Sequence, residues 1–79
     1  MLTMYTTTWC GHCVRLKRGL DAAGIGFQEV NIEEDAEAAD LVMRVNGGNR
    51  TVPTVLLPDG TTLTNPPVDQ VQARLAKAS

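Results

Sequence analysis

Two cysteines separated by two residues are the most reactive feature of this sequence. Cys10 and Cys13 are its only cysteines, and they lie in the stretch TTTWCGHC. Side chains at this spacing can alternate between dithiol and disulfide, supply part of a metal site, or pack inertly in a small core. The local structure around them decides which chemistry is available.

The residues around the pair predict a strand before it and a helix after it. The run LTMYT, Leu2–Thr6, is rich in β-branched and aromatic residues, as strands are. Helical spacing begins at about Gly11 and stops at Gly24 and Gly26. Cys10 is therefore predicted to lie at a helix N-terminus, where free N–H groups favour a thiolate and lower its pKa below about 8.5. Cys13 lies one turn inside the helix and is predicted to be the shielded, resolving thiol.

The rest of the chain completes an alternating pattern of strands and helices. A second strand is predicted at Phe27–Ile32, and the acidic segment 33–48 predicts a second helix that ends at Asn46-Gly47-Gly48. The segments TVPTVLL and TTLT predict a hairpin whose turn is Asp59-Gly60, and a last helix follows, with Pro67 at its first position. The sequence thus predicts one α/β domain, residues 1–79. Its order is β-α-β-α-β-β-α, with a four-stranded mixed sheet flanked by three helices.

Apolar periodicity predicts which side chains these helices bury. The first helix places Cys13, Leu16, Leu20 and Ala23 on one face. The second is predicted to bury Ala38, Leu41, Val42 and Val45, and the third Val68, Val71 and Leu75. Tyr5 is predicted to be a core residue of the first strand.

Composition excludes several classes of protein. The chain is 43% hydrophobic and 20% charged, with a net charge of −2, which does not favour nucleic acid or an anionic membrane as partner. No apolar run approaches the roughly 20 residues that span a bilayer. The strand-like start is unlike a signal peptide, and two cysteines would make a weak disulfide framework. We expect a cytoplasmic monomer.

Other interpretations of the cysteine pair are weaker. A structural zinc site needs four ligands, and only Cys10, His12 and Cys13 are available as obvious candidates. An iron–sulfur cluster shared between two subunits would require additional thiols. An inert core pair does not explain the placement between a strand and a helix. The redox interpretation is favoured, and no bound metal is expected.

Longer motifs resemble a known family. The stretches MYTTTWCGHC, RTVPTV and DGTTLTNP resemble the glutaredoxin branch of the thioredoxin superfamily over essentially the whole chain. Within that branch, VNGGNRTVPTV and LTNP are most similar to the mycoredoxins, actinobacterial enzymes that use the sugar-based thiol mycothiol. The resemblance implies a thioredoxin-like fold and a thiol-disulfide oxidoreductase that removes mycothiol from mycothiolated proteins.

The resemblance also implies a reaction cycle. Cys10 would attack the mycothiol sulfur of a mixed disulfide. Mycothiol would then regenerate the protein as a co-substrate, with no bound cofactor, and an NADPH-dependent mycothiol disulfide reductase would recycle it indirectly. Cys13 would be dispensable in this monothiol cycle and could form an off-path disulfide with Cys10.

The TVP motif is implied to hold the substrate. In this superfamily the proline, here Pro53, follows a cis peptide bond, and the exposed backbone of Val52 pairs with the substrate. The alternative is a trans proline that opens an edge strand. Thr51 belongs to the same motif, and the neighbouring Arg50 is a candidate for substrate contact.

This chain departs from the glutathione-using members of the family at two places. They usually carry lysine where Thr7 stands, and a Gly-Gly-x-Asp-like turn where this chain has Thr64-Asn65-Pro66. In those relatives the lysine and the Gly-Gly-x-Asp-like turn both bind glutathione. The hydroxyl and amide groups of Thr7, Thr64 and Asn65 suit the uncharged mycothiol better.

Two further residues lie beside the nucleophile. His12 stands where many glutaredoxins have tyrosine, and as a cation it would stabilise the Cys10 thiolate. Trp9 is expected either to offer an exposed contact to partner proteins or to pack against the Pro53 loop.

Two rival functions remain. An NrdH-type redoxin, reduced by thioredoxin reductase and donating electrons to ribonucleotide reductase, would use both cysteines, but such proteins usually carry an FRPD-like turn in place of LTNP. A non-enzymatic iron–sulfur or metal-binding module typically has serine at the Cys13 position.

Overall fold

A computed structural model describes residues 2–78 of the chain. Its elements follow the predicted order: β1 (Leu2–Thr6), α1 (Gly11–Ala22), β2 (Phe27–Asn31), α2 (Ala36–Val45), β3 (Thr54–Leu56), β4 (Thr62–Thr64) and α3 (Val68–Ala78). The four strands form one mixed sheet in the order β2-β1-β3-β4. The β1–β2 pair is parallel, with Leu2 opposite Phe27, while the β1–β3 and β3–β4 pairs are antiparallel. This confirms the predicted topology.

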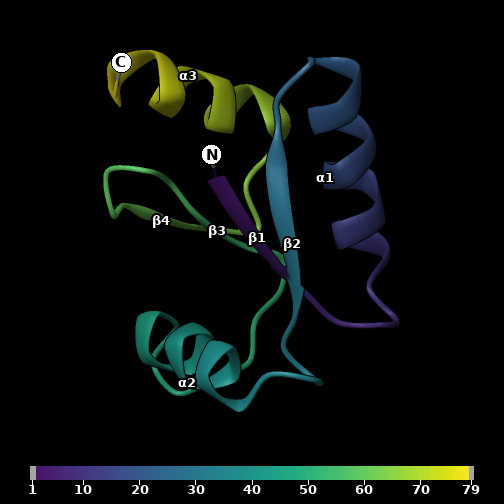
Figure 1. Cartoon of the computed structure of the whole chain (residues 1–79), viewed down its shortest axis with the longest axis vertical. Helices are drawn as coiled ribbons and strands as arrows, with labels where there is room; N and C mark the ends of the chain where they lie inside the picture. Colours follow the sequence, from purple (N-terminus) through teal and green to yellow (C-terminus); the bar gives the residue numbers. More distant parts are fainter. Residues whose placement is uncertain (1, 79) are drawn as a thin grey trace.

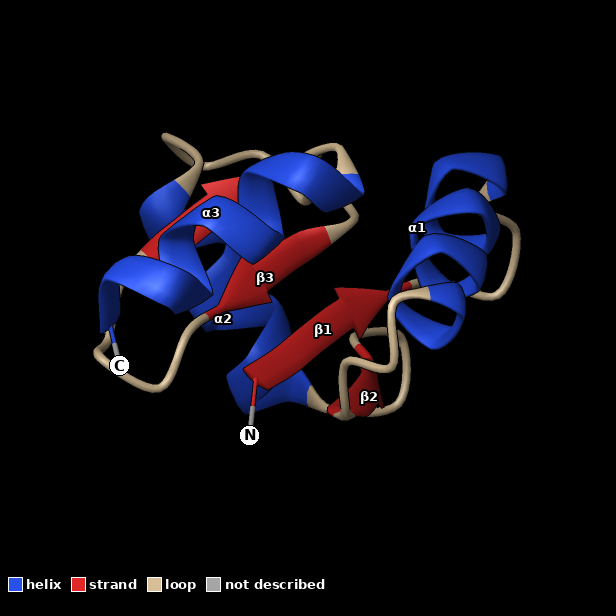
Figure 2. Ribbon diagram, turned by 90° about the horizontal axis from the view of Figure 1, so that it is seen from above, coloured by secondary structure: helices blue, strands red, loops and turns tan. Residues whose placement is uncertain are grey.

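Helices cover both faces of the sheet. Figure 1 places α2 on the opposite side of the sheet from α1 and α3. Figure 2, seen from above, has α3 in front of β3, and β1 lies between α3 and α1 with its tip beside α1. Because successive side chains of a strand point to opposite faces, β1 contributes Met4 to one layer and Tyr5 to the other. The long strand β1 therefore lies at the centre of both cores.

Each core is built from aliphatic side chains of the sheet and the helices over it. The larger core lies under α1 and α3 and contains Leu2, Met4, Cys13, Leu16, Leu20, Val55, Leu57, Leu63 and Val71. The smaller core lies under α2 and contains Tyr5, Ile32, Ala38, Ala39 and Val42. Cys13 is part of the larger core, so one member of the cysteine pair is anchored beneath α1.

The ends of the elements follow local chemistry. The Asp35 carboxylate accepts a hydrogen bond from the Ala38 N–H at 3.1 Å and caps α2. At the other end of α2, Gly47 and Gly48 have φ values of 66° and 97°, a backbone region that glycine enters at low cost. The hairpin turn also forms as predicted, with the Thr61 N–H bonded to the Asp59 carboxylate at 2.9 Å.

Some predicted bounds were too generous. The second strand stops at Asn31 instead of Ile32, and the segment TVPTVLL forms a strand only over Thr54–Leu56. The proline of that segment supplies no N–H to a sheet ladder, so pairing starts after it. Pro67 lies just outside α3, and its carbonyl oxygen accepts bonds from the N–H groups of Gln70 and Val71.

Two predicted core residues are not buried. Ala23 lies beyond the end of α1 and is exposed, while Val45, the last residue of α2, is 38% exposed. In α2, Ala39 is buried and Val45 is not. The stripe of α2 that faces the sheet runs through Ala38, Ala39 and Val42 and does not extend into the last turn of the helix. Three other predicted core residues are only half-buried: Leu41, Val68 and Leu75.

Candidate active site

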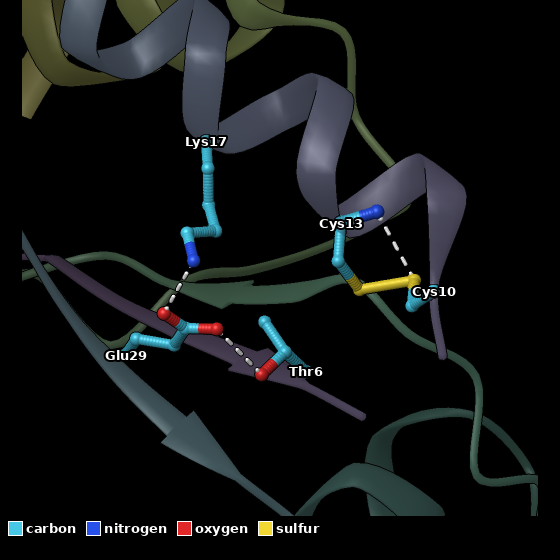
Figure 3. A network of polar contacts seen from close by, with 5 residues as sticks. All are labelled: Thr6, Cys10, Cys13, Lys17 and Glu29. Carbon is cyan, nitrogen blue, oxygen red and sulfur yellow. Dashed lines mark hydrogen bonds and ion pairs between the residues drawn. A yellow bond between two sulfur atoms is a disulfide. The ribbon is translucent and has the colours of Figure 1, made fainter. Parts of the chain in front are cut away.

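Cys10 caps helix α1 with its sulfur. Its backbone is extended, with φ −136° and ψ 101°, and its Sγ accepts a hydrogen bond from the Cys13 N–H at 3.0 Å. The two sulfurs form a disulfide, and their Cα atoms lie 5.2 Å apart (Figure 3). Cys10 is half-buried, whereas Cys13 is 2% exposed. An incoming thiol or disulfide therefore reaches Cys10 more readily, and an N–H group is already aimed at the sulfur that would become negative.

The segment before Cys10 is held by the last residue of β2 and by a residue that follows the strand. The Thr8 N–H donates to Glu33 Oε1 at 2.7 Å, and the Asn31 side-chain amide donates to the Thr8 hydroxyl at 3.2 Å. Glu33 is itself fixed, since its N–H donates to Asn31 Oδ1 at 2.9 Å. The bond from the Thr8 backbone holds the pKa of Glu33 below its ordinary value of 4.5. These bonds fix the course of the chain just before Cys10.

A second polar network ties α1 to the sheet, as Figure 3 shows. Lys17 Nζ lies 2.9 Å from Glu29 Oε1, and the Thr6 hydroxyl donates to Glu29 Oε2 at 3.0 Å. The bond from Lys17, supported by the one from Thr6, holds the pKa of Glu29 below 4.5. Lys17 lies one turn beyond Cys13, so the network joins the helix that carries the cysteines to both β1 and β2.

The Val52–Pro53 peptide bond is cis, as the resemblance implied. The Thr54 hydroxyl donates to the Thr51 carbonyl at 2.7 Å, and the Asn65 N–H donates to the Pro53 carbonyl at 2.7 Å. The side chain of Val52 packs against the same core cluster as Cys10. Within residues 2–78, no hydrogen bond occupies the backbone N–H or C=O of Val52. That backbone is free to pair with another chain.

Asn46 connects this loop to two distant elements. Its amide donates to the Val42 carbonyl at 2.8 Å and to the Thr54 hydroxyl at 3.1 Å, and its Oδ1 accepts from the Thr64 hydroxyl at 2.6 Å. The sequence indicated Asn46 only as the end of α2. Its position before two glycines is typical of a helix cap and carries no signal for the longer contacts.

A groove runs between α1 and α3. Its volume is about 480 Å³, and it is lined by His12, Arg15, Leu16, Gly19, Asn65, Pro66, Pro67, Val68 and Asp69. Two of the predicted substrate-binding residues, His12 and Asn65, thus share one concave surface. Asn65 has a φ of 47°, which a non-glycine residue rarely adopts and asparagine tolerates better than most.

The other predicted site residues differ in their exposure. Trp9 is 91% exposed, so the expected alternative of packing against the Pro53 loop is wrong. Arg50 is exposed and Thr7 half-buried. The Thr64 hydroxyl donates its hydrogen to Asn46, which leaves only its lone pairs for a ligand.

Two other kinds of feature are absent from residues 2–78. No group of three or more His, Cys, Asp or Glu side chains gathers there as metal ligands would. No helix in that range is long and apolar enough to cross a bilayer.

Comparisons with known proteins agree with the geometry. A family model described as Glutaredoxin matches residues 2–61. "Putative glutaredoxin Rv3198A" of Mycobacterium tuberculosis strain H37Rv is 59% identical over 76 residues, 96% of this chain and 90% of the relative. "Mycoredoxin 1" of Corynebacterium glutamicum is 43% identical over 74 residues, 94% and 91% of the two chains.

A solved structure supports the same fold. The glutaredoxin-like protein NrdH-redoxin from Escherichia coli superposes with a TM-score of 0.76 at 26% identity, covering 91% of each chain. The predicted thioredoxin-like architecture is therefore confirmed.

Proposed function

This chain belongs to the glutaredoxin family, and we propose that it reduces mixed disulfides between proteins and mycothiol. In this proposal the redox chemistry takes place at Cys10 and Cys13, the two cysteines of the chain. The observation that carries the proposal is the hydrogen bond from the Cys13 N–H to the Cys10 sulfur, because it favours the thiolate at the accessible cysteine.

The reaction we propose consists of two exchanges. The Cys10 thiolate attacks the mycothiol sulfur of the mixed disulfide, and the target protein leaves as a thiolate that takes up a proton. The thiolate of a second mycothiol then attacks the mycothiol sulfur bound to Cys10. This step releases the Cys10 thiolate and mycothiol disulfide. Each turnover consumes one free mycothiol, because the other half of mycothiol disulfide comes from the mixed disulfide. The two electrons that reduce mycothiol disulfide again come from NADPH through a mycothiol disulfide reductase.

Cys13 has no required step in the proposed cycle. It is 2% exposed and belongs to the larger core, so it is poorly placed to attack an external substrate. It can displace mycothiol from Cys10 and form the intramolecular disulfide seen in Figure 3. Mycothiol would reopen that disulfide. The cycle therefore proceeds without Cys13.

The TVP loop supplies the substrate contacts in the proposed complex. The backbone of Val52 is free, and a strand-like segment of the target can pair with it, while Pro53 and Thr51 hold the loop in place. Trp9 and Arg50 are exposed and would contact the target protein. Thr7, His12, Thr64 and Asn65 would contact mycothiol.

The choice of mycothiol rests on relatedness and charge. The 43% identity to Mycoredoxin 1 extends over nearly the whole of both chains. Thr7 and the Thr64-Asn65 turn offer hydroxyl and amide groups but no cations for the carboxylates of glutathione. A reducing compartment suits a catalytic cysteine pair, so we place the protein in the cytoplasm as a monomer without bound cofactor.

The test is turnover of a mycothiolated peptide with mycothiol, mycothiol disulfide reductase and NADPH. We expect NADPH consumption by the wild type, retention of most activity in Cys13→Ser, and none in Cys10→Ser. An active Cys10→Ser protein would overturn the assignment of the nucleophile. Activity of the wild type only with thioredoxin reductase would instead favour a dithiol redoxin, the type of the NrdH-redoxin whose structure resembles this one.

A further inference from the structure

The groove between α1 and α3 lies beside the redox pair, although neither cysteine lines it. His12, between the two cysteines, is one lining residue, and Asn65, whose N–H holds the Pro53 carbonyl, is another. Gly19 lines the other end of the groove. It lies seven residues after His12 along α1, which corresponds to about 10 Å of helix. A molecule joined to the Cys10 sulfur can therefore lie along the groove.

The far end of the groove is closed by helix packing. A Cβ atom placed on Gly19 would lie 3.0 Å from the Cβ of Val68, so α1 and α3 touch there. Leu16 and Pro66 add apolar surface. The groove thus has a defined length and an apolar floor against which the C–H faces of a ring can pack.

The charged groups of the groove are balanced. Arg15 projects from the second turn of α1, and Asp69 lies in the first turn of α3. Both line the groove, and they form no salt bridge with each other. One guanidinium and one carboxylate offer both donors and acceptors while leaving no excess positive charge.

Such a lining suits an uncharged polyhydroxylated ligand. Each sugar hydroxyl both donates and accepts, so a carboxylate and a guanidinium can both be satisfied by it. The peptide thiol glutathione carries two carboxylates and one ammonium group, and this surface holds a single cation, so one of the carboxylates would find no cationic partner there. The charges of the groove therefore favour a sugar-based thiol over a peptide thiol that carries two carboxylates.

We propose that this groove binds the sugar portion of the thiol carried on Cys10, and that Arg15 and Asp69 determine specificity for it. The proposal rests on the function proposed above and deepens it, because it assigns the recognition of mycothiol to a surface beyond the cysteine pair and the TVP loop. Neither residue touches the reacting sulfurs; each contacts the part of the ligand that does not react.

The experiment compares two mixed disulfides of one peptide, one with mycothiol and one with N-acetylcysteine, which lacks the sugars. The rate of peptide-thiol release is measured in single turnovers of the reduced protein. Arg15→Ala and Asp69→Ala are each expected to slow the mycothiol substrate about tenfold, since a lost hydrogen bond to a charged group has that order of effect. The N-acetylcysteine substrate should react at the wild-type rate.

Matched controls lie on the same two helices. Arg18→Ala and Gln70→Ala remove side chains that do not line the groove, and both should leave the two rates unchanged. Thermal unfolding of every variant verifies its fold. Equal slowing of both substrates by Arg15→Ala and Asp69→Ala, or no slowing of either, would overturn the groove assignment.

Failure of the underlying function has a different signature. A wild type that releases the peptide no faster from mycothiol than from N-acetylcysteine would count against mycothiol as the partner and against the groove together. A wild type that prefers mycothiol, with variants that keep this preference, would overturn the groove assignment alone.

Discussion

At the residue scale, the two cysteines differ in exposure and in hydrogen bonding because they occupy different positions on α1. The Cys10 sulfur lies at the first turn of α1 and accepts a backbone hydrogen bond, whereas Cys13 points into the larger core. The Cys-x-x-Cys spacing and the strand-to-helix transition were sufficient to predict this asymmetry. The anchoring of Thr8 by Glu33 was not predictable, because the partners are 25 residues apart and each resembles an ordinary surface residue.

Selective alkylation measures the asymmetry directly. When the reduced protein is treated briefly with iodoacetamide, we expect mass spectrometry to find the label on Cys10, because Cys13 is 2% exposed and Cys10 is half-buried. Urea-unfolded protein should label at both positions and serves as the control. Equal labelling in the folded state would contradict the assigned roles.

The carboxylate of Glu29 makes a pH-dependent contribution to stability. Its pKa is lowered in the folded protein, so the contribution is present above the ordinary value of 4.5 and is lost as the pH falls through the lower, folded value. Glu29→Gln should therefore reduce the free energy of unfolding near neutral pH, and the difference from wild type should vanish in acid. The loss should stay below about 1 kcal/mol, because the ion pair is partly exposed.

Urea denaturation across this pH range provides the measurement. Glu34→Gln is the matched control, since Glu34 is exposed and its carboxylate makes no hydrogen bond among the described residues. A difference between Glu29→Gln and wild type that persists unchanged in strong acid would mean that folding does not lower the pKa of Glu29.

At the element scale, periodicity predicted the type and order of every helix and strand, but not how much of each is buried. Val45 continues the apolar pattern of α2, yet the helix ends there and the side chain is 38% exposed. The pattern indicates which face of a helix is apolar, and the partner surface decides how far that face is covered. The contact between α1 and α3 likewise had no signal beyond a glycine at position 19.

The close approach of α1 to α3 makes Gly19 sensitive to substitution. Gly19→Val should lower stability by about 1–3 kcal/mol, since its side chain would meet Val68. The double variant Gly19→Val/Val68→Ala should recover part of the loss. Gly11→Ala is the control, because a Cβ there meets no atom within 4 Å. Thermal unfolding checks all three, and a fully stable Gly19→Val protein would mean that the helices can separate without cost.

At the scale of the whole molecule, one side chain links segments that are far apart in the sequence. Asn46 joins the end of α2, the start of β3 and the end of β4 through three hydrogen bonds. The thioredoxin-like architecture and the cysteine site were predictable from local pattern and family resemblance. This link was not, because it depends on how the layers are placed in three dimensions.

Removing that link should affect the molecule globally. Asn46→Ala deprives the Thr64 hydroxyl of its acceptor and the Thr54 hydroxyl of its donor, and we expect a loss of about 1–3 kcal/mol in the free energy of unfolding. Asn49→Ala, which removes a single exposed hydrogen bond to the Asn46 carbonyl, should cost much less. Urea denaturation of the two variants decides the matter, and equal losses would show that Asn46 acts only as a helix cap.

The exposure of Trp9 determines how this protein can be followed by fluorescence. It is the only tryptophan, and 91% of it already faces water in the folded state. Unfolding is therefore expected to change the tryptophan emission wavelength little, and a thermal scan that follows this wavelength alone would show a small transition. Docking of a target protein would instead transfer the indole from water to an apolar surface. The indole lies next to Cys10 in the sequence, so its emission is expected to report each encounter with a target protein.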